Sequence, residues 1–353
     1  MVWRSTRVDK VLTVSVAAYN VEKYIEQCLN SFLRLGSAMD LVEVLVIDDG
    51  GQDCTEEKVK KYVEKFPNTF RFIHKHNGGW GSTVNTGIQL ATGKYFKLLD
   101  GDDFFLDEFL EDYIYTLSGL EVDIIYSPCC KFEDETNRKK GVFTYLLNSK
   151  IESKISLQDL EAAVPGITMH TATFRTSMLK ENNIKLCEHC FYTDSEYVIK
   201  AIAHSKTAYI YKNPIYSYRI GRAGQSVSDQ GIRKHYKENY TIIDELFRFE
   251  NEDSILNDNR KIVRQYIMKK ISLQYEHLAR LGKIEELKKL DTKIDVIYKY
   301  NYEELSADAQ KYRKSDFKYV DRYLKMNKYK NKIKNIIEKY ELLYNVIMQI
   351  YYK

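Results

Sequence analysis

The sequence predicts an α/β protein with a mostly parallel sheet, followed by an all-helical C-terminal domain. In the first hundred residues, short apolar runs alternate with longer segments of helical periodicity, as in chains that build a parallel sheet. Glycines and polar residues follow four of these apolar runs. After residue 231 glycine becomes rare and apolar residues recur at helical spacing. We therefore expect an α/β domain over 1–228 and a helical domain over 229–353.

Each element follows from its local pattern. Apolar runs without polar alternation are typical of parallel strands covered on both faces. These strands are predicted over 11–17, 41–47, 70–74 and 95–99. Helices are predicted over 21–35, 55–66 and 81–91, with Thr55 as the cap of the second. The mixed region beyond is predicted to hold strands at 123–127 and 208–220, and helices at 156–164 and 194–204.

Composition narrows the class of protein. The 353 residues carry a net charge of +4, and 44% hydrophobic with 29% charged residues excludes wholesale disorder. Six cysteines in so long a chain do not form a dense disulfide framework. The first ten residues lack the apolar core of a signal peptide, and no apolar run is long enough to span a membrane. These features favour a cytoplasmic protein with reduced thiols.

Parallel sheets bind ligands beyond the carboxyl ends of their strands. At one such end, Asp100, Asp102 and Asp103 lie within four residues and repel one another unless they are compensated. A divalent cation that also holds phosphate oxygens would compensate them. The alternative is that an aspartate caps a following helix over 104–117, which accounts for only one of the three.

The other strand ends allow alternatives. The Asp48–Gly51 segment suits either a strand-to-helix turn or a carboxylate that binds a base or sugar. The segment 77–81 resembles a dinucleotide fingerprint, but Gly87 follows Gly81 by six residues, where that fingerprint needs three, so a dehydrogenase is disfavoured. Backbone N–H groups there can still bind diphosphate. Cys187-Glu188-His189-Cys190 has the spacing of half a zinc site without a second pair.

Together these segments resemble the family 2 glycosyltransferases, whose GT-A fold is a nucleotide-diphospho-sugar transferase fold with a mostly parallel, Rossmann-like sheet. The likeness covers about residues 10–226 and depends on the order and spacing of several motifs. The matching segments are 14–20, 46–50, 77–87, 91–95, 99–103, 174–184 and 192–197.

The resemblance implies an inverting, metal-dependent transferase that uses a UDP-sugar. It implies that Asp102 binds Mn²⁺ or Mg²⁺ with help from Asp103, and that Asp194 is the general base. One carboxylate suffices to deprotonate the acceptor hydroxyl as it attacks the anomeric carbon. Many members carry Glu before this base, whereas this chain has Thr193.

The resemblance also implies the donor contacts. Tyr19 would flank the nucleobase, Asp49 would accept a hydrogen bond from a uracil N–H, and Asp100 would touch the ribose. The other donor-binding residues expected at these strand ends are Ala18, Asn20, Asn77, Gly79, Asn85 and Gly101.

One departure concerns the diphosphate. Many members carry Arg before Asn85, whereas this chain has Val84. We expect the loop after the 208–220 strands to supply the contact instead, because arginines on a glycine-containing loop can clamp phosphate. The residues expected in this clamp are Arg219, Arg222, Gln225 and Ser226. The alternative is an ordinary surface hairpin loop.

The end of the chain is strongly basic. Residues 311–353 hold twelve Lys or Arg and four Asp or Glu, a net of +8, and the rest of the chain is therefore −4. A basic amphipathic helix there suits an anionic membrane surface. The alternative is that its Ile and Tyr face packs on the preceding helices or on a second subunit in a homodimer. No nucleic-acid motif accompanies the charge, so nucleic acid is not an expected partner.

The predicted activity is sugar transfer to a glycan or lipid-linked glycan acceptor in cell-surface polysaccharide synthesis, at the inner face of the membrane. A nucleotidyltransferase is an alternative, but it needs a Gly-rich loop with Lys or Arg after the first strand, and 18–20 supplies none. A non-catalytic nucleotide-sugar-binding protein is the other alternative, and the intact Asp102 and Asp194 argue against it.

Overall fold

The computed structural model describes residues 9–134, 138–142, 153–221, 228–299, 302–307 and 309–310. The chain divides into two compact units, residues 1–266 and 267–353, and the division falls within helix α10 (Arg260–Arg280). Helix α8 begins at Asp229, where the sequence predicts the helical region to start. A domain boundary after residue 228 stays a prediction.

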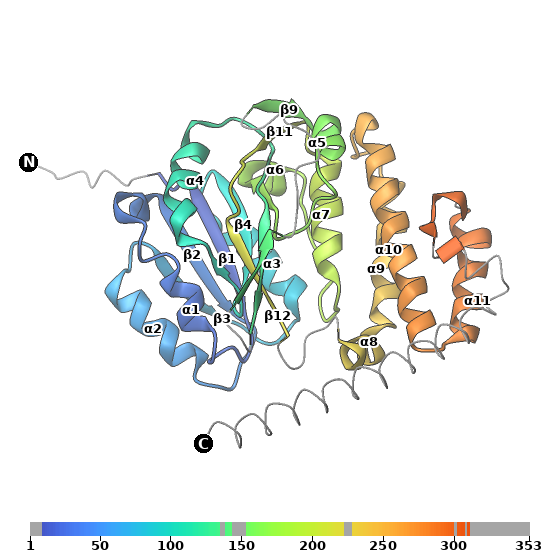
Figure 1. The fold of residues 1–353 in the computed structure, drawn as a ribbon, viewed down its shortest axis with the longest axis horizontal. Helices are drawn as coiled ribbons and strands as arrows, with labels where there is room; N and C mark the ends of the chain where they lie inside the picture. The colour runs from blue at the N-terminus through green and yellow to red at the C-terminus, as the bar shows by residue number, and fades with distance from the viewer. Residues whose placement is uncertain are drawn as a thin grey trace, which may run out of the picture. The chain divides into compact units, whose positions relative to one another are not determined.

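The first unit is built on an eight-stranded sheet in the order β3-β2-β1-β4-β10-β6-β11-β9 (Figure 1). Its parallel half consists of β1 (Leu12–Ala18), β2 (Val42–Asp48), β3 (Phe70–His74) and β4 (Tyr95–Asp100). The other half consists of β6 (Ile124–Tyr126), β9 (Lys154–Ser156), β10 (Ala172–Arg175) and β11 (Thr207–Ile210). Strand β10 is antiparallel to both neighbours, whereas β6 and β11 are parallel. The predicted mostly parallel sheet is therefore confirmed.

Helices cover this sheet, and a small second sheet lies in the order β5-β12-β7-β8. Its strands are β5 (Phe104–Phe105), β7 (Cys129–Glu133), β8 (Arg138–Val142) and β12 (Tyr216–Ile220). The helices are α1 (Ile25–Asn30), η1 (Gly36–Leu41), α2 (Thr55–Lys65), α3 (Trp80–Leu90), α4 (Asp107–Gly119), α5 (Leu157–Ala163), α6 (Thr176–Glu181), α7 (Thr193–Ala203), α8 (Asp229–His235), α9 (Glu238–Glu250) and η2 (Asn257–Asn259).

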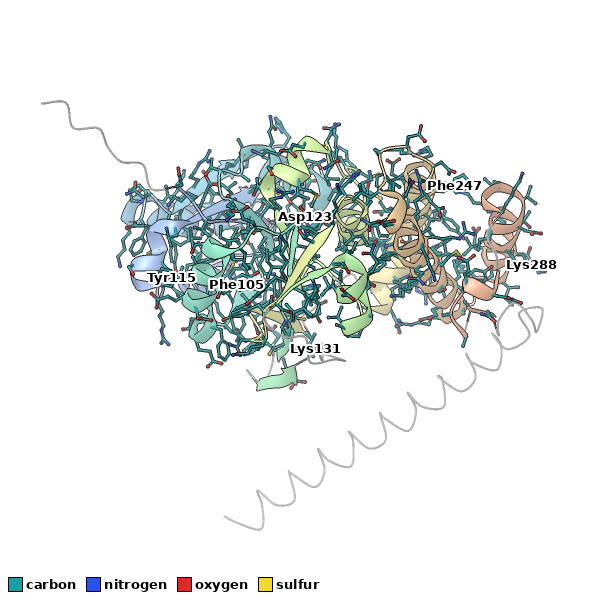
Figure 2. The ribbon with its side chains drawn as sticks, turned by 90° about the horizontal axis from the view of Figure 1, so that it is seen from above. Phe105, Tyr115, Asp123, Lys131, Phe247 and Lys288 are labelled. Atoms are coloured by element: carbon teal, nitrogen blue, oxygen red, sulfur yellow. The ribbon has the colours of Figure 1, made fainter. Side chains whose placement is uncertain are left out.

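The core explains the apolar runs of the sequence. Every residue of β2 is buried, because helices cover both faces of the central strands. The ring of Phe105, which is labelled in Figure 2, packs edge-on against Phe32 and against Tyr216 of the same small sheet, with centroids 5.5 and 6.0 Å apart. Phe32 also packs edge-on against Phe70 of β3 at 6.0 Å, so Phe32 links the two sheets. The predicted helix over 21–35 is shorter in the structure, where α1 ends at Asn30. The Ser31 hydroxyl bonds to the Cys28 carbonyl there, which competes with continued helix.

The predicted cap of α2 is wrong. Thr55 lies inside the helix, and its hydroxyl accepts the Val21 N–H at 3.1 Å, so it ties α2 to the end of the first loop. The N-cap is Cys54, whose side chain makes no capping hydrogen bond, and the Asp53 carboxylate just before it accepts the Thr55 N–H at 3.0 Å.

In the second unit, the rest of α10 is followed by α11 (Ile284–Thr292), a π-helix η3 (Lys293–Tyr298) and η4 (Tyr302–Glu304). The apolar stripe predicted for one helix is confirmed in α10, where Val263, Ile267, Ile271 and Leu278 are all buried. No helix within the described ranges has the length and apolar character needed to cross a bilayer. The basic segment 311–353, with its predicted membrane or subunit contact, lies outside the described residues.

Candidate active site at the carboxyl edge of the sheet

The strand ends that the sequence singles out meet at one edge of the sheet. Ala18 pairs with Asp48 across β1 and β2, and Ala17 pairs with Asp100 across β1 and β4. The Asp49 N–H donates to the Ala18 carbonyl at 2.9 Å, so the residues just past the strands remain in register. Segments that are distant along the chain therefore share one surface.

The Asp100–Asp103 turn closes on itself at this edge. The Asp103 N–H donates to the Asp100 carbonyl at 2.9 Å, and the Asp103 side chain is only 2% exposed. Its two oxygens accept the Tyr216 hydroxyl at 2.6 Å and the Arg219 N–H at 2.7 Å. Helix α4 begins at Asp107, so this turn does not cap it. The capping alternative is thereby excluded.

The turn contributes to a metal-ligand group that the sequence did not reveal. One ligand atom each from Asp100, Asp103 and His170 lies within 4.8 Å of the others, the only such group in the described part of the chain. His170 comes from the segment before β10, and a lone histidine there gave no local signal. Asp102 is not in the group, and its carbonyl accepts the Arg219 Nε–H at 2.6 Å. A metal role for Asp102 therefore stays a prediction.

The electrostatics of this group suit a cation. Burial raises the pKa of the Asp103 carboxyl well above its usual range, and the charges of Asp102 and Asp100 raise it further. Burial lowers the pKa of His170 to about 4, so its imidazole is neutral and keeps a lone pair. Two carboxylates and a neutral imidazole form a donor set for a divalent metal ion. The Cys187–Cys190 pair forms no such group within the described residues.

Arg219, which the sequence assigns to a phosphate clamp, binds protein groups in the structure, and its contact with a diphosphate stays a prediction. It is 2% exposed, and its guanidinium donates to the Asp102 carbonyl at 2.6 Å, to Asp134 at 2.7 Å and to Gln27 at 2.5 Å. It also lies 4.7 Å from the centre of the Tyr24 ring. Its donors are directed at protein acceptors, so it holds the acidic turn in place. The other expected clamp residues, Arg222, Gln225 and Ser226, lie outside the described residues.

The predicted base-binding carboxylate organises the neighbouring loop. Asp49 is 4% exposed, and its oxygens accept the N–H groups of Gly78 and Gly79 at 2.9 and 2.8 Å. It also pairs with Lys75, which the sequence did not single out. The Asn77 amide donates to the Asp49 carbonyl at 3.0 Å. Asp49 thus fixes the start of α3, and its contact with a base stays a prediction.

The donor side also has an open aromatic surface. Tyr19 is 52% exposed directly after β1, as a stacking residue would be. Asn20 has a φ of 52°, and its side chain accepts the Gln52 N–H at 2.8 Å, which joins the ends of β1 and β2. Trp80 was not predicted, yet its indole N–H donates to Asp100 at 2.7 Å and orients that carboxylate. Gly101 lies close to the first strand, because a Cβ added there would be 3.0 Å from the Ala17 carbonyl.

The predicted base, Asp194, is exposed in the first turn of α7. Its negative charge opposes the lowering of the His170 pKa that burial causes. Asn85 acts on the loop before α7. Its amide accepts the Leu186 N–H at 2.8 Å and donates to the Leu186 carbonyl at 3.0 Å. A direct donor contact by Asn85 stays a prediction.

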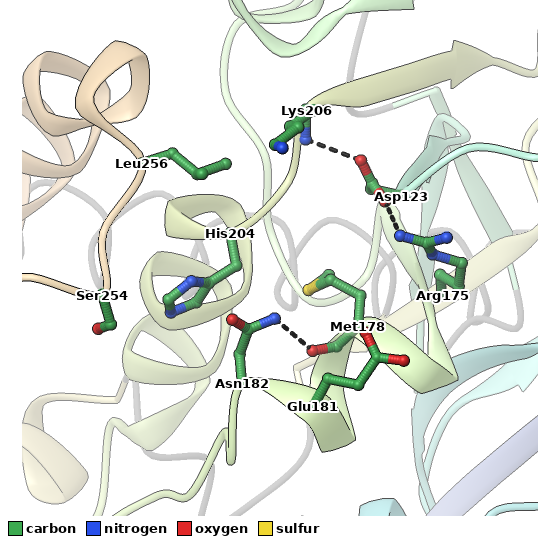
Figure 3. A pocket seen from close by; sticks show the side chains of 9 residues that line it. All are labelled: Asp123, Arg175, Met178, Glu181, Asn182, His204, Lys206, Ser254 and Leu256. Carbon is green, nitrogen blue, oxygen red and sulfur yellow. Dashed lines mark hydrogen bonds and ion pairs between the residues drawn. The ribbon is translucent and has the colours of Figure 1, made fainter.

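A separate pocket lies at the opposite edge of the sheet, at the amino ends of β6 and β11 (Figure 3). Asp123 binds the Lys206 N–H at 2.8 Å and pairs with Arg175, so its carboxylate is used within the protein. The pocket contains none of the predicted site residues. Its lining residues are Asp123, Arg175, Met178, Glu181, Asn182, His204, Lys206, Ser254 and Leu256.

Residues 13–182 match the family model "Glycosyl transferase family 2". Residues 13–182 therefore carry a family 2 glycosyltransferase domain, and the resemblance seen in the strand-end motifs is confirmed. The site described above lies largely within the matched residues, while Asp194 and Arg219 follow them.

Among similar proteins is the "Putative glycosyltransferase EpsH" of Bacillus subtilis, 25% identical over 263 residues, which covers 73% of this chain and 74% of that protein. The poly(ribitol-phosphate) beta-N-acetylglucosaminyltransferase TarS of Staphylococcus aureus is 26% identical over 217 residues, 61% of this chain and 36% of TarS.

Solved structures share the fold. A crystal structure of TarS 1-349 in complex with UDP-GlcNAc has a TM-score of 0.61 at 19% identity and covers 90% of this chain and 92% of that one. The mannosyltransferase PcManGT of Pyrobaculum calidifontis, in complex with GDP-Man and Mn²⁺, has a TM-score of 0.50 at 15% identity and covers 91% and 85%. At these identities the likeness establishes the GT-A fold.

Proposed function

We propose that this glycosyltransferase is inverting and metal-dependent, and that it moves a sugar from a UDP-sugar to a hydroxyl of a glycan or lipid-linked glycan acceptor. The observation that carries the proposal is the grouping of Asp100, Asp103 and His170, whose imidazole senses the charge of the exposed Asp194. One side of this arrangement can hold a metal-bound diphosphate, and the other can accept a proton.

Three residues of the site provide ligands for a metal ion, and two others orient those ligands. Asp100 and Asp103 would supply oxygen ligands and His170 a nitrogen ligand to a divalent cation, and imidazole favours Mn²⁺ over Mg²⁺, which prefers oxygen ligands. A cation held there would supply positive charge to a departing diphosphate. The Tyr216 hydroxyl donates to Asp103 and the Trp80 indole N–H donates to Asp100, and these hydrogen bonds orient both carboxylates.

Asp194 takes the proton of the acceptor hydroxyl as it attacks the anomeric carbon. One general base is enough, because the nucleotide is already a good leaving group and no covalent intermediate is needed. The attack comes from the face opposite the diphosphate, so the anomeric carbon is inverted. Exposure of Asp194 leaves room for an acceptor to approach it.

The donor and the pathway are supported by relatives. TarS binds UDP-GlcNAc in its crystal structure, and its name describes transfer to poly(ribitol-phosphate). An exposed Tyr19 beside a buried Asp49 is a suitable surface for a uracil base. We propose a role in cell-surface polysaccharide synthesis in the cytoplasm, with the basic segment 311–353 contacting either the anionic inner membrane face or a second subunit.

A thermal-shift panel of UDP, UDP-sugars and GDP-sugars, each with and without Mn²⁺, tests the proposal. A ligand that binds only the folded state raises the unfolding midpoint. We expect uridine nucleotides to raise it, and Mn²⁺ to increase that rise. His170→Ala should remove the Mn²⁺-dependent part, whereas His204→Ala at the opposite edge of the sheet should keep it. No response to any uridine nucleotide would refute the donor assignment.

A further inference from the structure

A lysine lies buried in the middle of the sheet beneath this site. Lys97 is a central residue of β4 and has no exposed surface. Its ammonium donates to the carbonyls of His170 at 3.0 Å and Ala172 at 3.2 Å. Within the described residues, no carboxylate lies at ion-pair distance from it. The lysine therefore binds backbone dipoles rather than a countercharge.

Burial of an ammonium group in this way is costly. Lys97 has no exposed surface, so its charged form has lost the hydration it would have in water, and two backbone carbonyls replace that hydration only in part. Methionine has a similar length and would fill the same space without that cost, as apolar replacements of buried charges often do. A lysine at this position therefore needs a reason other than packing.

The contacts of Lys97 supply that reason. The two carbonyls it binds flank Thr171, so it fixes the backbone that carries His170 into the site. The His170 ring stands edge-on to the Tyr216 ring, with centroids 4.9 Å apart. The Lys97 ammonium also lies 5.8 Å from the centre of the Tyr216 ring. Tyr216 in turn donates its hydroxyl to Asp103. Lys97 thus contacts the backbone that positions His170 and the Tyr216 ring, whose hydroxyl binds Asp103, so it supports two of the three residues in the metal-ligand group.

We propose that Lys97 is a positioning residue of this site: by holding the His170–Ala172 backbone and the Tyr216 ring, it keeps the His170 nitrogen facing Asp100 and Asp103. The inference rests on the proposed function, because it concerns binding of a divalent cation with the diphosphate. Residues that orient metal ligands commonly change metal affinity about 10- to 100-fold when they are replaced.

Lys97→Met tests this in the full-length chain. Mn²⁺ binding is followed by the electron paramagnetic resonance signal of free Mn²⁺, and UDP binding by calorimetry with and without Mn²⁺. We expect Mn²⁺-dependent UDP affinity to fall about tenfold or more, and metal-free UDP affinity to stay unchanged. The matched control is Lys10→Met, because Lys10 also donates to backbone carbonyls, those of Asp40, Val42 and Asn68, but before the amino end of β1. Lys10→Met should bind both as wild type does.

A double-mutant cycle separates positioning from general stability. If Lys97 acts through His170, then Lys97→Met combined with His170→Ala should lose little more Mn²⁺ affinity than His170→Ala alone. Additive losses would overturn the proposal. If Lys97→Met does not fold by circular dichroism, Lys97→Gln takes its place, and failure of both to fold would assign Lys97 to stability alone and overturn it.

The remaining outcomes separate the two proposals. A wild-type protein that binds neither UDP nor Mn²⁺ refutes the proposed function, and the role of Lys97 with it. A wild type that binds both, with Lys97→Met unchanged, overturns the role of Lys97 and leaves the proposed function in place.

Discussion

Replacing Arg219 with methionine distinguishes a residue that holds the acidic turn from one that grips the donor diphosphate. Methionine keeps the buried aliphatic volume but removes the guanidinium, which donates to the Asp102 carbonyl, to Asp134 and to Gln27 at 2.5 to 2.7 Å. The backbone N–H of Arg219 still reaches Asp103 in the variant. The change therefore isolates the contribution of the side chain.

The magnitude follows from burial. The Arg219 side chain is 3% exposed and that of Asp134 is 24% exposed, so removing the arginine leaves a largely desolvated carboxylate unpaired. Breaking a buried pair in this way costs about 3 to 5 kcal/mol, and the partial exposure of Asp134 favours the lower end. Each lost hydrogen bond to a neutral acceptor adds about 1 kcal/mol. We expect the free energy of unfolding to fall by about 5 kcal/mol, a large share of the stability of a typical domain.

Urea denaturation followed by tryptophan fluorescence measures this, with UDP calorimetry on the same samples. Arg248→Met is the control, because Arg248 pairs with Glu245 at the surface and should change neither quantity noticeably. Arg219→Lys should recover only part of the stability, because one ammonium cannot reach all three acceptors. If Arg219→Met keeps wild-type stability and loses UDP binding, then the arginine contacts the diphosphate and our structural assignment is refuted.

Two further predictions concern the acceptor side. Asp194→Asn should keep UDP binding and lose sugar transfer, because the amide cannot accept the proton. The control Asp159→Asn, in the first turn of α5, should keep both UDP binding and sugar transfer. Sugar transfer by Asp194→Asn would show that Asp194 is not the general base. Gly81→Ala should lower the unfolding midpoint and weaken UDP binding, because the new Cβ would lie 2.1 Å from the Cys187 carbonyl. The control Gly119→Ala should change neither quantity, because a Cβ there meets nothing within 4 Å. A Gly81→Ala protein as stable as wild type would contradict the close approach of Gly81 to the Cys187 carbonyl.

Some site residues can be found from sequence because their signals are local. Acidic and glycine-containing segments after continuously apolar strands must lie at the carboxyl edge of a parallel sheet, so the chain's own pattern places Asp49, Asp100 and Asp103 there. Arg219 is found for the same reason, but its burial and its protein partners could not be predicted from its position in the sequence. The position of Arg219 near the end of a strand can be read from neighbouring residues in the sequence. Its burial depends in part on Gln27, which is 192 residues away along the chain.

The sequence by itself determined the parallel sheet, the succession of strands and helices along the chain and the acidic turn at the sheet's edge. The reason is that burial on both faces requires apolar runs, and these are visible along the chain. Only the tertiary structure brought His170 to that turn and Lys97 beneath it. A single histidine or lysine has no periodicity, and the contact between these two joins residues 73 positions apart, so its energy depends on how β4 and the segment before β10 pack together.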